Sequence, residues 1–361
     1  MVLFIGADVH KKSHTLVAVD PVGKQIGQLQ VMATKAGHEK AYRWAKKFKD
    51  QDRLWGVEDC RMLTGHLERD LLAHGEAVVR VKPKLMAGQR ASARTYGKSD
   101  PIDALSVARA MAREQDLPLA RPAGPEREVR LLLARREDVV AERTRAVNRL
   151  RWHLHELDPE LDPSHGALNR ATTRRQLRAF LDGTEGVVAE IAGMELEDID
   201  RHCQQVKDLD RRIRHLVAEL APELLQIPGC AELTAAKVLG ETAGIDRFAT
   251  AGKYVMFAGC APVPVWSGNT AGHVRLNRRG NRQLNCAIHR IAITQARLEG
   301  PGQDYYLRLR ASGKGKMEAL RCLKTAIART LWRTMTRAQD HQAKAGAPPP
   351  LTETTPLPQA A

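Results

Sequence analysis

The first 120 residues alternate short apolar runs with longer amphipathic stretches, and the order of these segments restricts the possible folds. Residues 2–8 (VLFIGAD), 15–20 (TLVAVD) and 25–31 have the length and apolar character of strands, and short polar turns separate them. We predict that they form an antiparallel meander. The pattern then predicts a helix at about 37–49, a strand at 53–58, a helix at about 64–73, a strand at 77–81 and a helix that begins at Pro101.

An order of three strands followed by alternating helices and strands, with hairpins first and crossovers afterwards, is the layout of an RNase H-like nuclease fold. We therefore expect an α/β domain over residues 1–120. Local chemistry supports the start of its last helix, because Asp100 can cap it and Pro101, at the first helical position, has no N–H group to satisfy.

The rest of the chain is predicted to be all-α. Beyond residue 125 the sequence is strongly charged, and two stretches carry apolar residues at heptad spacing: Val140, Val147, Leu150, Leu154 and Leu157, then Val206, Leu209, Ile213, Leu216 and Leu220. We expect a helical coiled-coil connector over 125–222, either as an antiparallel hairpin or as a contact between subunits. A helix-rich basic domain is expected over 223–340, and a disordered tail rich in Pro, Thr and Ala over 343–361.

The charge of the chain favours a polyanionic partner. Its 57 Lys and Arg against 42 Asp and Glu give a formal net charge of +15, so nucleic acid is the first candidate. A spanning helix needs roughly 20 apolar residues, and neither such a run nor a signal-peptide pattern is visible. We expect no membrane association and a cytoplasmic location. The six cysteines are scattered singly, without zinc-site spacing, and are expected to be reduced.

Four acidic residues lie where the predicted fold would gather them. Asp8 ends the first strand, Glu58 ends the fourth, and Asp100 and Asp103 share one face at the start of the last helix. Strand alternation favours Glu58 over its neighbour Asp59. Clustered carboxylates suit Mg²⁺, and two such ions about 4 Å apart could serve phosphodiester chemistry. The alternative for the helical pair is a cap with a first-turn acid that favours the helix dipole.

Two short segments are candidates for contact with nucleic acid. Lys11 and Lys12 follow the first strand and could touch phosphate or only solvate a turn. Within 225–244, Pro228-Gly229 resembles the tight turn of a helix-hairpin-helix element, whose backbone N–H groups can meet a DNA phosphate. The alternative for this turn is an ordinary corner between helices without a ligand.

A serine near the C-terminal end is a candidate nucleophile. Ser267 precedes a flexible glycine and is followed by Arg275, Arg278 and Arg279. Arginine can bind phosphate oxygens in a bidentate way and stabilise developing charge, so the serine hydroxyl could attack phosphorus. A Ser-Gly pair is by itself also typical of a surface turn.

The order and spacing of several motifs together carry a family resemblance. They are GADVHKKSH at 6–14, VEDC at 57–60, GKSDPIDA at 97–104, IPGCAELTAA at 227–236, and WSGNT with RRGNRQL within 266–284. With these motifs the chain resembles the insertion-sequence-110 family of DEDD transposases, also called bridge-RNA-guided recombinases. It departs from the family at Asn285-Cys286, where a more basic pair is usual.

The resemblance implies a function and a set of partners. Asp8, Glu58, Asp100 and Asp103 would form the DEDD metal site of a RuvC-like domain, and Ser267 would be the nucleophile of the transposase domain. The family further implies a covalent phosphoserine link to donor and target DNA, a structured noncoding bridge RNA, and homodimers that assemble into a tetramer in which two subunits complete each active site.

Two other functions compete with this one. A metal-dependent junction-resolving endonuclease would hydrolyse DNA with water and use the C-terminal domain only to grip its substrate. A nucleic-acid-binding structural protein would need none of the four carboxylates.

Overall fold

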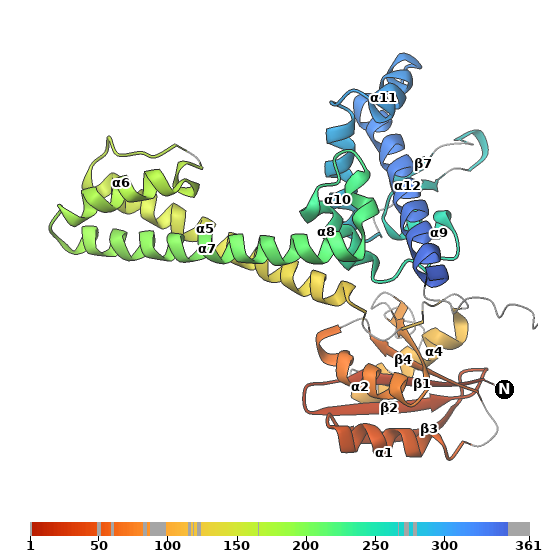
Figure 1. The fold of residues 1–361 in the computed structure, drawn as a ribbon. Helices are drawn as coiled ribbons and strands as arrows, with labels where there is room; N and C mark the ends of the chain where they lie inside the picture. The colour runs from red at the N-terminus through yellow and green to blue at the C-terminus, as the bar shows by residue number, and fades with distance from the viewer. Residues whose placement is uncertain are drawn as a thin grey trace, which may run out of the picture. The chain divides into compact units, whose positions relative to one another are not determined.

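The computed structural model divides the chain into two compact units, Met1–Ala123 and Gly124–Ala361, and each is described here by itself (Figure 1). The structure describes residues 2–48, 52–58, 61–81, 85–86, 99–114, 117, 119–120, 124–164, 166–265, 267–270, 274–276 and 280–345.

The first unit is built on a five-stranded mixed sheet with the strand order β3-β2-β1-β4-β5. Its strands are β1 (Val2–Val9), β2 (Ser13–Val19), β3 (Gln25–Met32), β4 (Asp52–Glu58) and β5 (Ala77–Val81). The strands β1, β2 and β3 pair antiparallel, whereas β4 pairs parallel with both β1 and β5. The predicted meander and the alternation of helices and strands after it are confirmed.

Helices cover both faces of this sheet. The helices α1 (Lys35–Ala45) and α2 (Arg61–Ala73) pack on one face, against a core that includes Ile5 and Trp55, and α4 (Asp100–Arg113) packs on the other. Glycine lets α4 approach closely. A Cβ atom on Gly6 would lie 2.2 Å from the backbone oxygen of Ala104, and one on Gly56 would lie 1.8 Å from Met111 Sδ. The backbone of α4 therefore lies directly on β1, and the side chain of Met111 occupies the space over Gly56 of β4.

The start of α4 differs from the prediction in one detail. Ser99, in extended conformation, is the N-cap residue, and Asp100 is the first residue of the helix. The Asp100 carboxylate lies near His10 and is not the cap, because its position in the first turn directs it toward the end of β1. Pro101 stands in the first turn as predicted, where its missing N–H group leaves no helix hydrogen bond unmade.

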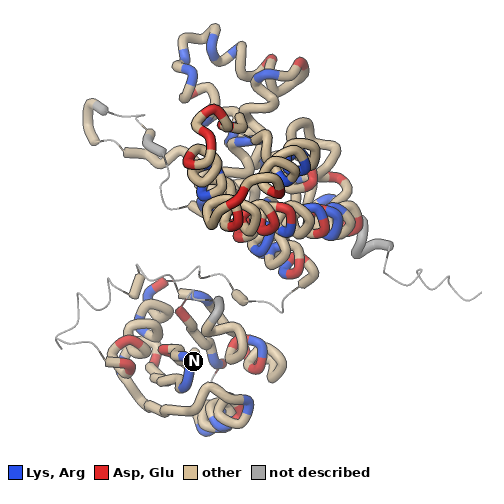
Figure 2. The backbone as a smooth tube through the Cα atoms, turned by 90° about the vertical axis from the view of Figure 1, so that its left-hand side faces the viewer, with Lys and Arg blue, Asp and Glu red and all other residues tan. Residues whose placement is uncertain are grey.

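The second unit begins with a long helical hairpin. The helices α5 (Glu126–Leu157) and α7 (Val187–Leu220) lie antiparallel and side by side, and buried leucines such as Leu150, Leu154 and Leu196 line their contact (Figure 1). Of the two predicted arrangements, the structure contains the hairpin; supercoiling of the pair stays a prediction. The helix α6 (Ala171–Asp182), which the sequence pattern did not predict, packs at the tip. Both charge signs are mixed along these helices (Figure 2).

The remainder of this unit is helix-rich, as predicted. Its elements are η2 (Pro222–Gln226), α8 (Glu232–Thr242), α9 (Ala251–Phe257), β6 (Pro262–Pro264), η3 (Gly268–Thr270), β7 (Val274–Leu276), α10 (Arg282–Gln295), α11 (Pro301–Ala311) and α12 (Lys316–Ala345). Val129 of α5 and Ile213 of α7 belong to the same core as Leu284 and Leu331, so the expected connector and the expected C-terminal domain share a core.

Two further expectations concern the end of the chain and the membrane. The helix α12 continues to Ala345, past the point at which we expected the tail to begin, and residues 346–361 lie outside the described part of the chain. Among the described helices, none is long and apolar enough to cross a membrane.

Candidate active site

Asp8 and Glu58 stand at the ends of neighbouring parallel strands. The strands β1 and β4 pair with Gly6 opposite Gly56, so the same register places Glu58 beside Asp8. Successive side chains of a strand point to opposite faces, and both glycines face α4. Two residues further on, the side chains of Asp8 and Glu58 are therefore on the α4 side of the sheet.

The first turn of α4 brings two more acids to this edge. Asp103 is 9% exposed and Asp8 only 7%, whereas Asp100 is half-buried. His10 stands between two of the carboxylates: its Nε2 lies 3.0 Å from Asp8 Oδ2 and 3.4 Å from Asp100 Oδ1. The close packing of α4 on β1, which the two glycines permit, produces this arrangement.

The electrostatics at Asp8 are unfavourable to its charge. Burial raises the pKa of Asp8 above its ordinary value, and the nearby carboxylates of Asp103 and Asp100 raise it further, while His10 acts in the opposite direction. A carboxylate that is both desolvated and surrounded by like charge is stabilised by a bound cation. The site therefore has the electrostatic character of a metal site.

The predicted carboxylates are brought together to different degrees. One ligand atom from each of Asp8, His10 and Asp100 lies within 4.8 Å of the other two. Asp103 is close enough to affect the pKa of Asp8, and Glu58 is half-buried at the end of β4. Neither belongs to that group of three among the described residues. From the sequence, His10 could touch phosphate or solvate a turn, and it was not assigned to the carboxylate group; its place two positions after a strand-end acid was the available signal.

Ser267 lies in the connection between β6 and β7, which pair antiparallel as a short two-stranded sheet. Its side chain is exposed, and Gly268 follows it with a φ of 48°. This positive φ favours glycine and turns the chain directly after the serine. Ser267 belongs to the second unit and the carboxylates belong to the first.

The two ends of the serine-bearing segment are held together at its base. A Cβ atom on Gly280 would lie 2.2 Å from Gly259 Cα, so the two backbones are in direct contact. Asn285 Nδ2 donates to the carbonyl oxygens of Ala258 and Gly259, at 2.8 and 3.1 Å, and Lys324 Nζ donates to Asn285 Oδ1 at 2.6 Å. Asn285, at which the sequence departs from the family that it resembles, is thus part of the support for this segment.

The predicted basic contacts are only partly described. Lys11 and Lys12 are exposed in the turn between β1 and β2. Arg275 stands in β7 with its side chain outside the described part of the structure, and Arg278 and Arg279 lie outside the described residues altogether. All five nucleic-acid contacts proposed for lysine and arginine therefore stay predictions.

Gly229 occupies the predicted turn with a φ of 81°. A Cβ atom there would lie 2.9 Å from Thr294 Cβ, and Gln295 Nε2 donates to the carbonyl oxygen of Pro228 at 2.9 Å. The turn is thus packed against α10. This contact accounts for the glycine without a ligand, and a phosphate contact at Gly229 stays a prediction.

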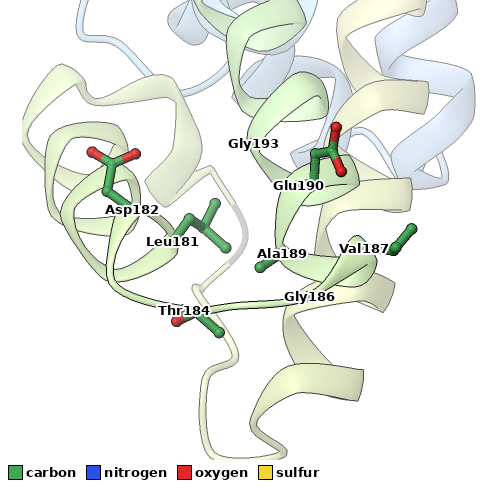
Figure 3. A pocket seen from close by; sticks show the side chains of 8 residues that line it. All are labelled: Leu181, Asp182, Thr184, Gly186, Val187, Ala189, Glu190 and Gly193. Atoms are coloured by element: carbon green, nitrogen blue, oxygen red, sulfur yellow. The ribbon is translucent and has the colours of Figure 1, made fainter.

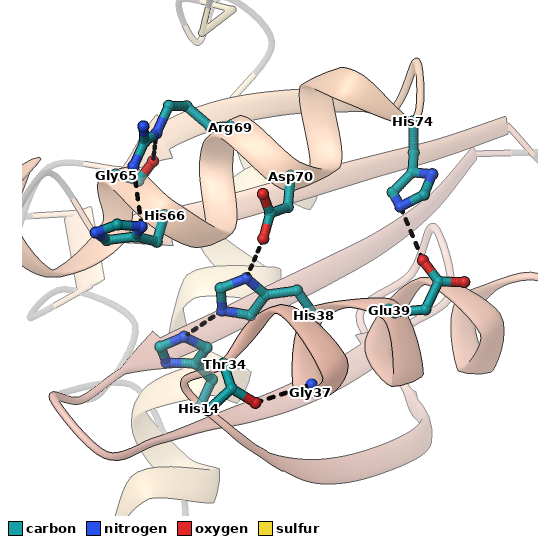
Figure 4. Close-up of polar contacts among 10 residues, drawn as sticks. All are labelled: His14, Thr34, Gly37, His38, Glu39, Gly65, His66, Arg69, Asp70 and His74. Carbon is teal, nitrogen blue, oxygen red and sulfur yellow. Dashed lines mark hydrogen bonds and ion pairs between the residues drawn. The ribbon is translucent and has the colours of Figure 1, made fainter.

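A buried polar chain that we did not predict lies on the other face of the sheet (Figure 4). His14 Nε2 is 3.1 Å from His38 Nε2, and His38 Nδ1 is 2.5 Å from Asp70 Oδ2. His14 and His38 are 2% and 3% exposed. Burial, followed by the proximity of His38, lowers the pKa of His14 from 6.5 to about 4. These two hydrogen bonds link β2, which follows the turn that carries His10, to α1 and α2.

Two surface hollows lie outside the predicted site. A hollow of about 320 Å³ opens above His38 and Asp70, with Lys35, His66 and Arg69 among its lining residues (Figure 4). Another, of about 440 Å³, lies at the tip of the hairpin, and its lining includes Leu181 and Asp182 of α6 and Ala189 and Glu190 of α7 (Figure 3). Neither is lined by any of the predicted catalytic residues.

Two family models and several relatives match the chain. A model described as Transposase, of the IS110 DEDD type, matches residues 5–159, and one described as Transposase IS116/IS110/IS902 family matches residues 221–307. The 44.8 kDa protein of insertion element IS116 from Streptomyces clavuligerus is 26% identical, over 91% of this chain and 94% of its own length. The 42 kDa protein of IS900 from Mycobacterium paratuberculosis is 27% identical, over 73% of this chain and 77% of its own.

Two further similarities were found. The 43.6 kDa protein of IS110 from Streptomyces coelicolor is 26% identical, over 88% of this chain and 90% of its own length. Among solved structures, T. thermophilus RuvC in complex with Holliday junction substrate matches 31% of this chain and 93% of its own length, at 14% identity and a TM-score of 0.26. A similarity at that score carries no argument. The two family models, which together cover more than half of the sequence, and the near full-length relatives show that the chain belongs to the IS110 family of insertion-element transposases.

Proposed function

We propose that this transposase cuts and rejoins DNA through a covalent bond between Ser267 and a DNA phosphate, assisted by Mg²⁺ held by Asp8, Glu58, Asp100 and Asp103. The observation that carries the proposal is the convergence of strand-end and helix-start acids on one side of the sheet, with Asp8 buried among them. Family membership supports DNA as the substrate.

The residues at this edge fit a hard divalent cation. The carboxylates supply oxygen ligands, which Mg²⁺ prefers, and the raised pKa of Asp8 reflects a surplus of negative charge. When bound, the ion would stabilise charge that develops on phosphate oxygens. His10, half-exposed between Asp8 and Asp100, is placed to hold those carboxylates in position and to donate to a phosphate.

The proposed serine step is a transfer of one phosphodiester for another. The Ser267 oxygen forms a bond to phosphorus while the bond from phosphorus to one deoxyribose oxygen breaks, and the serine proton ends on the departing DNA hydroxyl. Attack by a DNA hydroxyl on the phosphoserine reverses the exchange and seals a new strand. One phosphodiester replaces another in each direction, so rejoining needs no external energy source.

The proposed partners rest on family membership alone. A structured guide RNA would select donor and target DNA, and a tetramer built from dimers would bring the serine of one subunit to the carboxylates of another. RNA that copurifies with the full chain and protects it from proteolysis would support the first point. A tetramer that forms on DNA would support the second.

The experiment is to trap protein–DNA adducts by denaturing active reactions that contain labelled DNA and Mg²⁺. We expect wild-type protein to form an adduct and Ser267→Ala to form none, while Asp8→Ala loses strand cleavage. Ser312→Ala is the matched control, because Ser312 is also exposed and precedes a glycine, Gly313, with positive φ.

The outcome that would contradict the proposal is cleavage by wild-type protein without any adduct, together with full cleavage by Ser267→Ala. That result would favour the hydrolytic endonuclease. If both variants still bind DNA and no protein, wild type included, cleaves it, the structural DNA-binding protein would be favoured.

A further inference from the structure

The helix α12 carries an arginine face that forms no ion pair among the described residues. Arg329, Arg333 and Arg337 are exposed and follow one another at intervals of four residues. The buried residues Leu331 and Met335 of the same helix lie two positions away, about 200° around the helix axis. The three guanidinium groups are thus on the side that faces away from the core.

Acids are sparse near this face. Between Glu318 and Asp340 the helix contains no acidic residue. In the part of the chain that the structure describes, no ion pair involves any of the three arginines.

The helical hairpin of the same unit offers a contrast. It too is rich in arginine, and many of its arginines form ion pairs with acids of the same or the neighbouring helix, although Arg127, Arg130 and Arg145 form none among the described residues. The pairs are Arg136–Asp210, Arg149–Glu195, Arg201–Asp198, Arg211–Asp208 and Arg212–Glu128. These hairpin arginines therefore have a structural partner, whereas Arg329, Arg333 and Arg337 have their charge available for a ligand.

The spacing of these charges matches a polyanion. Residues four apart in a helix are displaced by about 6 Å along its axis, so the face extends for about 12 Å. One DNA strand carries a phosphate every 3.4 Å or so of duplex axis, so the face spans roughly three phosphates. Guanidinium groups bind phosphate oxygens in a bidentate way.

We propose that the α12 face, formed by Arg329, Arg333 and Arg337, binds the backbone of duplex DNA independently of its sequence. The inference rests on the proposed function for the choice of DNA, and it adds a surface that no motif of the sequence indicated. Because the contacts are to phosphate, they set the affinity and the position of the protein on the duplex, not the choice of target.

The test measures binding of the full chain to a short DNA duplex of arbitrary sequence, and to an RNA duplex of the same sequence. Both are measured in EDTA over a range of salt concentrations. The test variant carries Arg329→Gln, Arg333→Gln and Arg337→Gln. The matched control carries Arg201→Gln, Arg211→Gln and Arg212→Gln, which removes the same charge from exposed but ion-paired arginines of the hairpin. A third variant replaces the α12 arginines with lysine.

We expect the α12 variant to lose at least about tenfold in affinity at low salt, and the slope of log K against log salt to fall by about 2.7, or about 0.9 for each lost phosphate contact. The control should keep the wild-type slope, and the lysine variant should recover most of it. Thermal unfolding of each variant checks whether the fold is retained. We expect that it is, because none of these side chains is in the core.

Equal slopes in the α12 variant and its control would overturn the proposal, and so would a loss confined to an RNA duplex with DNA binding unchanged. Because EDTA suppresses the chemistry, this result is independent of the Ser267 adduct. Failure of the binding surface and failure of the proposed reaction are therefore distinguishable.

Discussion

At the scale of single residues, Asp8 is placed where its charge opposes folding. Asp8 is almost fully buried, and burial and neighbouring carboxylates both raise its pKa. By contrast, the buried Glu76 is paired with Arg53 and Trp55, which together lower its pKa despite burial. A buried acid without an arginine partner is a better indicator of function than burial alone.

His14 gives the first unit a dependence on pH with a defined sign. Its pKa is about 4 in the folded state against an ordinary value of 6.5, so in this interval the unfolded chain binds a proton that the folded chain does not. The free energy of unfolding should therefore decrease as the pH falls from 6.5 to 4, by about 3 kcal/mol in total. Above pH 6.5 this contribution is fully present.

Urea denaturation at a series of pH values measures this effect. We expect His14→Gln to flatten the pH dependence between 4 and 6.5, whereas His66→Gln, on the exposed surface of α2, should leave the wild-type slope unchanged. Identical slopes for wild type and His14→Gln would contradict the assignment.

At the scale of elements, the position of α4 relative to β1 decides whether the site exists. The contact depends on the missing side chain of Gly6, since a Cβ atom there would lie 2.2 Å from a backbone oxygen of α4, which cannot move aside alone. We predict that Gly6→Ala lowers the free energy of unfolding by about 1–3 kcal/mol, as overpacking does. It should also abolish Mg²⁺-dependent cleavage, because it displaces Asp100 and Asp103 from Asp8.

Gly65→Ala provides the comparison. A Cβ atom on Gly65 would have no neighbour within 4 Å, and the residue lies inside α2. Alanine should stabilise that helix by about 0.5–1 kcal/mol and leave cleavage intact. Urea denaturation and a cleavage assay separate the two variants; equal effects of both would show that the contact of α4 with β1 is not decisive.

At the scale of the whole molecule, the chain consists of two units with separate cores. The core of the first includes Ile5 and Trp55, and that of the second includes Tyr254 and Leu331. We predict two transitions in calorimetric unfolding of the full chain. Gly6→Ala should lower the midpoint temperature of only one transition, and Leu331→Ala that of only the other. Loss of the buried leucine should reduce the free energy of unfolding of its unit by about 2–5 kcal/mol. A single transition that both variants shift would show that the units unfold together.

The sequence alone determined the order of the elements in the first unit, the helical nature of the second and the four acids of the candidate site. These features depend on periodicity, turn residues and capping, which act over a few neighbouring residues. Asp8 and Glu58 were recognisable because each ends an apolar run of strand length. Their identification needed no knowledge of what lies next to them.

Only the tertiary structure decided which of these residues meet. It placed His10 between Asp8 and Asp100, arranged the two long helices as a hairpin, and left Arg329, Arg333 and Arg337 without an ion pair among the described residues. Each outcome depends on the packing of segments far apart in the chain. Gly6 shows the physical reason. From the sequence, a glycine inside a strand is expected only to weaken that strand. Its role in allowing α4 to pack closely on β1 is visible only when the strand register and the position of the helix are known.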